Sequence, residues 1–227
     1  MGNSNRFAVI GLGRFGMRLA RGLASAGVEV IAVDKRQALV EQMRDVVTLA
    51  VALDATDEEA IVAQGIDKVD VAIVGVGGAF EASALATSIL KSLGVPRVIS
   101  RATTRQRAEI LSRIGADDIV NPEAESADRW CSRMVMPQVT EKIDLGEAHS
   151  LVQIRTPAAW VGKTLTQLNV RKKFKVNVVA IHRLPPGKDP RTHAYVIDTP
   201  LPDSKIESGD LLLVVGTNEA IEALPRE

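Results

Sequence analysis

The 227-residue chain is short of several residue types, and each shortage excludes a class of protein. A single cysteine, Cys131, excludes an intramolecular disulfide and fits a reducing compartment such as the cytoplasm. Lys and Arg number 28, as do Asp and Glu, which removes the main electrostatic argument for binding nucleic acid or an anionic membrane. No apolar run approaches the roughly 20 residues that span a bilayer, and we recognise no signal peptide. We expect a cytoplasmic protein that binds no nucleic acid.

Side chains suited to catalysis are also scarce. The three histidines, His149, His182 and His193, do not have the spacing of metal ligands. Tyr195 is the only tyrosine, and Thr199 stands where a Tyr-x-x-x-Lys catalytic pair would need a lysine. Neither a nucleophile beside a base nor a paired acid and base is evident. This shortage favours a ligand sensor over an enzyme.

Apolar residues make up 46% of the chain, and their pattern predicts an α/β fold. Between residues 6 and 120, short β-branched runs that are apolar throughout alternate with helical patterns, as in a sheet covered by helices on both faces. We predict a Rossmann-like, doubly wound parallel sheet. The predicted strands are Arg6–Ile10, Val28–Val33, Thr48–Ala52, Val71–Val74, Arg97–Ser100 and Asp118–Val120. The predicted helices are Phe15–Ser25, Arg36–Arg44, Asp57–Gln64, Ala79–Leu93 and Thr104–Ile114.

The pattern changes after Pro122. One helix is predicted over Glu123–Gln138, and from about Thr140 short strands are separated by turns that contain Pro and Gly. The elements predicted in this second region are the strands Ser150–Arg155, Val176–His182 and Leu211–Val215 and the helix Asn218–Leu224. The domains are expected over residues 1–121, with a crossover helix over 122–139 and a small α+β domain over 140–227. So small a domain is marginal alone, which favours a dimer.

The sequence Phe7-Ala-Val-Ile-Gly-Leu-Gly-Arg-Phe-Gly16 places Gly-x-Gly-x-x-Gly between a strand and a helix, the dinucleotide-binding fingerprint. Gly11 permits the tight turn, Gly13 lets the backbone approach a pyrophosphate, and Gly16 lets the helix lie close to the strand. The helix N-terminus adds unpaired N–H groups for the phosphates. Asp34 ends the next apolar run, where it can accept hydrogen bonds from a ribose or begin the following helix. We therefore predict an adenine-nucleotide site.

Arg14 stands inside the glycine turn, at the start of the helix that faces the phosphates. An arginine there can fold over a terminal phosphate and pair with it, although a solvated surface arginine is the alternative. The residues that we assign to nucleotide binding are Gly11, Gly13, Arg14, Phe15, Gly16, Asp34, Lys35, Asp54, Ala55, Gly75, Val76, Gly77 and Arg101.

Several assignments rest on the ends of the other predicted strands. Asp54 can reach an adenine amino group or serve the turn alone, and Gly75–Gly78 is a phosphate-side loop or simply a tight turn. Arg101 ends the fifth strand, where an ionised side chain more often serves a ligand than packing. Glu123 can cap the exit helix or bind a divalent cation beside a phosphate, because Mg²⁺ and Ca²⁺ prefer oxygen ligands.

These motifs together resemble the KTN/RCK family, the cytoplasmic regulators of potassium channels and of Trk and Ktr transporters. The resemblance extends over nearly the whole chain and is closest to the regulatory subunit of Ktr-type uptake systems. The motifs that carry it are Phe7–Gly16, Ala32–Asp34, Asp54–Asp57, Leu93-Gly94, Ile114–Asp117, Pro122-Glu123, Leu168–Arg171 and Ile206–Gly216.

The resemblance implies a nucleotide sensor in which ATP activates and ADP inactivates a membrane potassium-translocating subunit. It implies dimers assembled into an octameric ring at the inner face of the membrane. Arg14 would contact phosphate, Asp34 ribose, and Glu123 a Mg²⁺ or Ca²⁺ ion at the dimer interface. It also implies a second site for cyclic di-AMP near Asn169, Val170, Arg171 and Ile181. The rival interpretation is an NAD(P)-dependent oxidoreductase or an NADH redox sensor.

Overall fold

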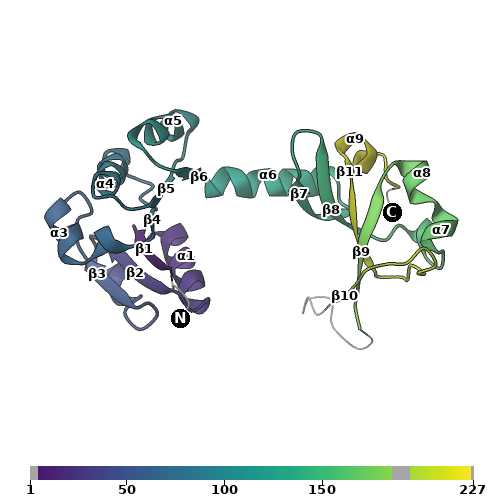
Figure 1. Ribbon diagram of the computed structural model, residues 1–227, viewed down its shortest axis with the longest axis horizontal. Helices are drawn as coiled ribbons and strands as arrows, with labels where there is room; N and C mark the ends of the chain where they lie inside the picture. Colours follow the sequence, from purple (N-terminus) through teal and green to yellow (C-terminus); the bar gives the residue numbers. More distant parts are fainter. Residues whose placement is uncertain (1–4, 186–194, 226–227) are drawn as a thin grey trace. The chain divides into compact units, whose positions relative to one another are not determined.

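A computed structural model describes residues 5–185 and 195–225, and it divides the chain into two compact units (Figure 1). One unit ends at Glu125 and the other begins at Ser126, so the division falls inside helix α6 (Pro122–Val135). His193 lies outside the described residues. Within the described ranges, no helix is long and apolar enough to cross a membrane.

The first unit is built on a six-stranded parallel sheet with the order β3-β2-β1-β4-β5-β6. The order reverses between β1 and β4, which defines a doubly wound sheet and confirms the predicted fold class. The strands are β1 (Arg6–Ile10), β2 (Glu29–Asp34), β3 (Leu49–Ala52), β4 (Val71–Val74), β5 (Arg97–Arg101) and β6 (Asp118–Val120). The helices are α1 (Arg14–Ser25), α2 (Gln37–Glu41), α3 (Glu58–Ala63), η1 (Ile66–Lys68), α4 (Phe80–Ser92) and α5 (Arg105–Ile114).

Successive residues of a strand enter different hydrophobic cores. In β1, Ala8 and Ile10 lie in the core formed with α3 and α4, whereas Val9 lies in the core formed with α1 and α2. Both faces of the sheet are therefore covered, and this is why its strands are apolar throughout instead of alternating. The helices hold the sheet between two layers, and the carboxyl ends of the strands remain open at one edge.

The second unit contains a five-stranded antiparallel sheet with the order β10-β9-β11-β8-β7. Its strands are β7 (Val139–Asp144), β8 (His149–Arg155), β9 (Asn177–Arg183), β10 (Val196–Asp198) and β11 (Leu211–Thr217). Its helices are η2 (Ala158–Trp160), α7 (Leu165–Leu168), α8 (Val170–Phe174) and α9 (Asn218–Glu222). Alternate residues of β8 and β11, such as Val152 and Leu212, share one buried core with Trp160 and Ile221. The predicted small α+β domain is confirmed.

Two strands of the second unit, β7 and β10, were not predicted from the sequence. The predicted helix over Glu123–Gln138 ends at Val135, and strand β7 begins at Val139. Strand β10 lies at the opposite edge of the sheet, and all of its residues are exposed. Edge strands bury little apolar surface, so charged residues such as Glu141 are tolerated there and no strand pattern appears in the sequence.

Gly16 sets the distance between α1 and the glycine turn. It is buried in α1, and a Cβ built on it would overlap the carbonyl oxygen of Gly11. By contrast, Gly22 lies further along the same helix, and a Cβ built there meets nothing within 4 Å. The helix can therefore approach the turn only because position 16 has no side chain.

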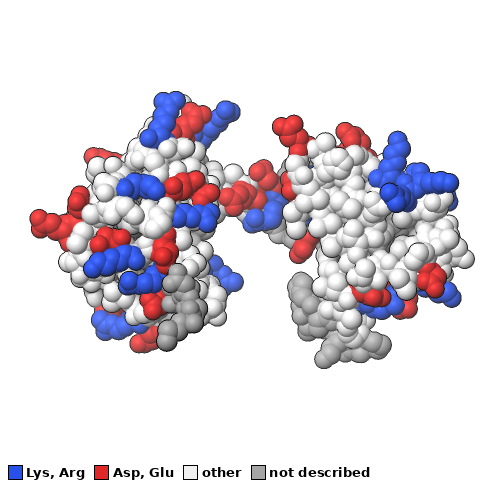
Figure 2. Space-filling model, viewed as in Figure 1, with Lys and Arg blue, Asp and Glu red and all other residues white. Residues whose placement is uncertain are grey.

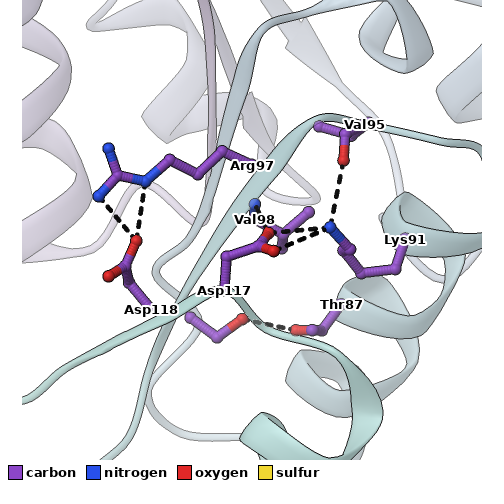
Figure 3. Close-up of polar contacts among 8 residues, drawn as sticks. Thr87, Lys91, Val95, Arg97, Val98, Asp117 and Asp118 are labelled. Atoms are coloured by element: carbon purple, nitrogen blue, oxygen red, sulfur yellow. Dashed lines mark hydrogen bonds and ion pairs between the residues drawn. The ribbon is translucent and has the colours of Figure 1, made fainter.

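Asp117 joins β5, β6 and α4 at the amino ends of the two strands (Figure 3). Its carboxylate accepts hydrogen bonds from the Val98 N–H at 2.6 Å and from Lys91 Nζ at 2.9 Å. These contacts hold the pKa of Asp117 below its usual value, and the hydrogen bond from the Val98 N–H is the largest cause. Beside it, Asp118 pairs with Arg97 on the surface, with 2.8 Å between Oδ2 and Nε.

Gly16→Ala is expected to lower the free energy of unfolding of the first unit by about 1–3 kcal/mol, because the new methyl group forces α1 away from the turn. Gly22→Ala is the matched control and is expected to raise it by about 0.5–1 kcal/mol, since glycine is costly inside a helix. Urea unfolding followed by hydrogen exchange of the first unit measures both. Equal effects of the two substitutions would contradict the close approach at Gly16.

Asp117→Ala is expected to lower the free energy of unfolding by about 1–2 kcal/mol at pH 7, mainly through the lost backbone hydrogen bond. Because the pKa of Asp117 is lowered in the folded chain, its contribution is complete above about pH 4 and is lost as the pH falls further. The effect of Asp117→Ala should therefore shrink in acid. Urea unfolding at pH 7 and at about pH 3 tests this. Asp118→Ala, which removes only an exposed ion pair, should cost less than about 1 kcal/mol.

Candidate functional site

A cleft of about 790 Å³ opens at the carboxyl ends of β1, β2, β4 and β5. It lies at the point where the strand order reverses, which is the usual ligand position in an open α/β sheet. Many of the residues predicted from the sequence line it together. They are Gly11, Gly13, Asp34, Lys35, Asp54, Ala55, Gly75, Val76, Gly77 and Arg101.

The glycine turn presents its backbone to the cleft. Gly11 has a φ of +93° and donates its N–H to the Val33 carbonyl over 2.7 Å. A Cβ at Gly11 would lie 3.0 Å from the backbone nitrogen of Val76, whereas a Cβ at Gly13 meets nothing within 4 Å. Helix α1 then begins at Arg14 with no side-chain cap and no acidic residue in its first turn. Its first N–H groups are therefore suited to an anionic ligand.

Asp34 is tied to the turn by its own hydrogen bonds. The side chain is 8% exposed, and Oδ2 accepts the Leu12 N–H at 2.8 Å. Oδ1 accepts the Arg36 N–H at 2.9 Å and Arg36 Nε at 3.2 Å. Arg36, not Asp34, is the N-cap of α2, so that alternative for Asp34 is wrong. A carboxylate oxygen can accept two hydrogen bonds, and Oδ2 accepts only one among the described residues, so it retains capacity for a ribose hydroxyl.

Asp54 shapes a turn, which is one of its two predicted roles, and it also lines the cleft. Its Oδ1 accepts the Thr56 N–H at 3.0 Å and the Thr56 hydroxyl at 2.8 Å, which shapes the turn before α3. The Thr56 N–H is the main cause of the lowered pKa of Asp54, followed by the hydroxyl, and Lys35 contributes least. Among the described residues, Asp54 Oδ2 has no hydrogen-bond partner, and the residue lines the cleft. One oxygen therefore serves the turn and the other is available to a ligand.

An apolar wall faces the polar end of the cleft. Leu53, Ala55 and Val76 line it and are partly buried against the core under α3 and α4. Leu85 on α4 adds an apolar side chain that is 47% exposed. Flat aromatic ligands are typically held between such apolar groups, with a few polar groups to orient them. The wall beside Asp34 and Asp54 has the character of an adenine site.

Arg101 closes the other side of the cleft. Its side chain is 16% exposed, pairs with Glu123 and lies with its Cζ 6.0 Å from the Phe15 ring centroid. A Cβ at Gly77 would collide with the guanidinium group. The Nε atom is buried without a hydrogen-bond partner among the described residues. A buried N–H donor without an acceptor is unusual, and beside a glycine turn it fits a phosphate oxygen.

Three predicted residues do not line the cleft. Gly16 lies under the turn, and Phe15 is partly buried beside Arg101 in the core formed with α1. Arg14 is exposed at the start of α1 and has no hydrogen bond or ion pair within residues 5–185 and 195–225. The position of Arg14 leaves its guanidinium group free for a phosphate or for a second chain.

Some residues that line the cleft were not assigned from the sequence. Arg36 and Thr56 directly follow the assigned segments at Asp34 and Ala55. Glu81 and Leu85 come from α4, where their spacing of four residues places them on one face of the helix. That face follows directly on the Gly75–Gly78 loop, and this was the only indication available in the sequence.

Glu123 pairs with Arg101, and its side chain is 63% exposed. It does not cap α6, because Asn121 Oδ1 accepts the Ala124 N–H at 3.1 Å and Asn121 N–H donates to Glu125. In the described part of the chain, no group of three or more His, Cys, Asp or Glu residues could hold a metal ion. A cation at Glu123 would therefore need ligands from a nucleotide or from a second chain.

The predicted second-ligand residues lie in the second unit. Val170 and Ile181 are 7% and 2% exposed and belong to its core. Asn169 ends α7 with a φ of +48°, and Arg171 is exposed on α8. Basic side chains gather over α8 on the face shown in Figure 2. The backbone of Asn169 and the exposed Arg171 are the parts of this set that a ligand could reach.

The chain is similar to known proteins in both of its units. The TrkA-N domain family matches residues 7–122, and the TrkA-C domain family matches residues 150–227. Ktr system potassium uptake protein C of Bacillus subtilis is 39% identical, covering 93% of this chain and 91% of the relative. Ktr system potassium uptake protein A of Vibrio alginolyticus is 33% identical, covering 95% and 94%.

Solved structures share the fold. The GsuK channel bound to NAD has a TM-score of 0.53 and 22% identity, and the match covers 97% of this chain and 38% of that chain. The NAD(P)-binding domain of an exopolyphosphatase-related protein from Archaeoglobus fulgidus has a TM-score of 0.51 and 26% identity, covering 56% and 96%. The two domain matches and the full-length relatives confirm the resemblance found in the sequence. The chain belongs to the TrkA-N/TrkA-C (KTN/RCK) family, which includes the Ktr potassium uptake proteins.

Proposed function

We propose that the chain is a nucleotide-sensing regulatory subunit of a potassium uptake system. The observation that carries this proposal is a cleft with an acidic end at Asp34, an apolar wall and a cationic end at Arg101. It occurs in a chain whose full-length relatives are named Ktr potassium uptake proteins. The subunit works in the cytoplasm and docks on a separate membrane protein that translocates potassium. It is not an enzyme.

The nucleotide acts through the number of its phosphates. ATP favours the conducting state of the partner and ADP the non-conducting state, because only ATP carries a third phosphate for Arg14. A ligand can shift such an equilibrium only by its difference in affinity for the two states, and about 1–3 kcal/mol is typical. The free guanidinium group of Arg14 supports this role, because nothing within the described residues occupies it.

The assembly that we propose is a dimer that builds an octameric ring. Residues 1–121 hold the nucleotide, the helix over 122–139 connects, and residues 140–227 contribute to dimerisation. Glu123 would bind a Mg²⁺ or Ca²⁺ ion together with phosphate oxygens at the dimer interface. A second ligand, cyclic di-AMP, would bind near Asn169 and Arg171. The exposed hydrophobic Trp130, Met134 and Val135 on α6 support contact with another chain.

Gly13→Ala is expected to weaken ATP and ADP binding at least tenfold without lowering stability. Its Cβ has open space in the folded chain but intrudes on the phosphate side of the cleft. Isothermal titration calorimetry with ATP, ADP and NADH measures this, and Gly22→Ala, which does not line the cleft, serves as the control. Tight NADH binding without any preference for ATP would instead favour a redox sensor or an oxidoreductase.

Arg14→Ala is expected to reduce the preference for ATP over ADP about tenfold, since a hydrogen bond to a charged group contributes about 1.5–3 kcal/mol. In liposomes that contain the membrane partner, potassium flux should be higher with ATP than with ADP, and Arg14→Ala should remove this difference. Arg18→Ala, also exposed on α1, is the control. Unchanged gating by Arg14→Ala would contradict the proposed role of this residue.

A further inference from the structure

The ion pair between Arg101 and Glu123 joins the nucleotide cleft to the first turn of α6. Arg101 ends β5 and lines the cleft, whereas Glu123 does not line it. A ligand in the cleft therefore meets the arginine first. The guanidinium group also lies beside Gly77, where a Cβ would collide with it, and 6.0 Å from the Phe15 ring centroid, so it has neighbours in the cleft besides the glutamate.

The two partners are unequally buried. The Arg101 side chain is 16% exposed and retains a buried Nε without an acceptor, whereas Glu123 is 63% exposed. Water can solvate the Glu123 carboxylate as soon as it leaves the pair, so the ion pair itself is a weak one. A phosphate offers several charged oxygens and can satisfy both Nε and a terminal nitrogen of the same guanidinium group. A phosphate in the cleft is therefore expected to bind the Arg101 guanidinium group more strongly than the Glu123 carboxylate does.

The sheet also sets which phosphate can reach Arg101. Asp34 ends β2 and Arg101 ends β5, three strand spacings apart, and this corresponds to about 14 Å at the sheet edge. A ribose held by Asp34 places its first phosphate over the glycine turn after β1. Each further phosphate extends toward β4 and β5. We therefore expect a second or third phosphate, not the first, to contact Arg101.

We propose that Glu123 is an internal competitor of the outer nucleotide phosphates for Arg101. This inference rests on the proposed nucleotide binding and adds a step in which the bound nucleotide breaks the ion pair between Arg101 and Glu123. When a di- or triphosphate takes Arg101, the carboxylate of Glu123 is released, and the start of α6 loses its tie to β5. The state of this ion pair thereby distinguishes a nucleotide with one phosphate from a nucleotide with two or three.

The test is a double-mutant cycle on nucleotide affinity, measured by calorimetry without divalent cations so that Glu123 has no metal to bind. Glu123→Gln is expected to tighten ADP binding about threefold to tenfold, because the competitor is removed. AMP affinity should change less than about twofold. Arg101→Gln should weaken ADP binding at least tenfold, and in that background Glu123→Gln should have no further effect.

Glu125→Gln is the matched control, because it removes the same charge two residues along α6 from a carboxylate that bonds Asn121. An equal gain from Glu125→Gln, or a gain from Glu123→Gln that persists with Arg101→Gln, would overturn the inference and leave nucleotide binding intact. So would an unchanged ADP affinity in Glu123→Gln. Absence of any nucleotide binding by the unmodified protein would overturn the proposed function and this inference together.

Discussion

The site depends on one buried hydrogen bond, from the Leu12 N–H to the carboxylate of Asp34. It spans 2.8 Å and joins residues 22 positions apart, so it fixes the glycine turn against the end of β2. The Arg36 N–H secures the other oxygen of the same carboxylate. A carboxylate that is only 8% exposed must be hydrogen-bonded, and the turn supplies the donor. The nearby end of α1 and the polar end of the cleft are thereby held in one arrangement before any ligand arrives.

The sequence was a good guide to the first unit because local and global requirements agree there. The strand Arg6–Ile10 was predicted with its observed bounds, since it is buried on both faces and its end is marked by a glycine turn. Gly65 and Gly115 directly follow two predicted helices, Asp57–Gln64 and Thr104–Ile114, and they adopt the positive φ angles typical of helix ends. The second unit was predicted less well. Its edge strands bury one face at most, and β10 buries neither, so their sequences lack the pattern that identifies a strand.

The candidate site was predictable where strands end in a motif and unpredictable where side chains meet across elements. Asp34 followed from its place after β2, and Arg101 from its place at the end of β5. That Asp34 would bond Leu12, and that Arg101 would bond Glu123, depends on side-chain directions that no spacing reveals. Long charged side chains can adopt many rotamers, and only the packing of the folded chain selects among them.

The close contact between Gly77 and Arg101 also bears on how this site can evolve. The two residues share one small space, because any side chain at position 77 would displace the guanidinium group. A side chain at position 77 therefore requires the arginine at position 101 to move or to be replaced by a shorter residue. Covariation of these two positions would record the constraint across the family, even where the ligand itself has changed.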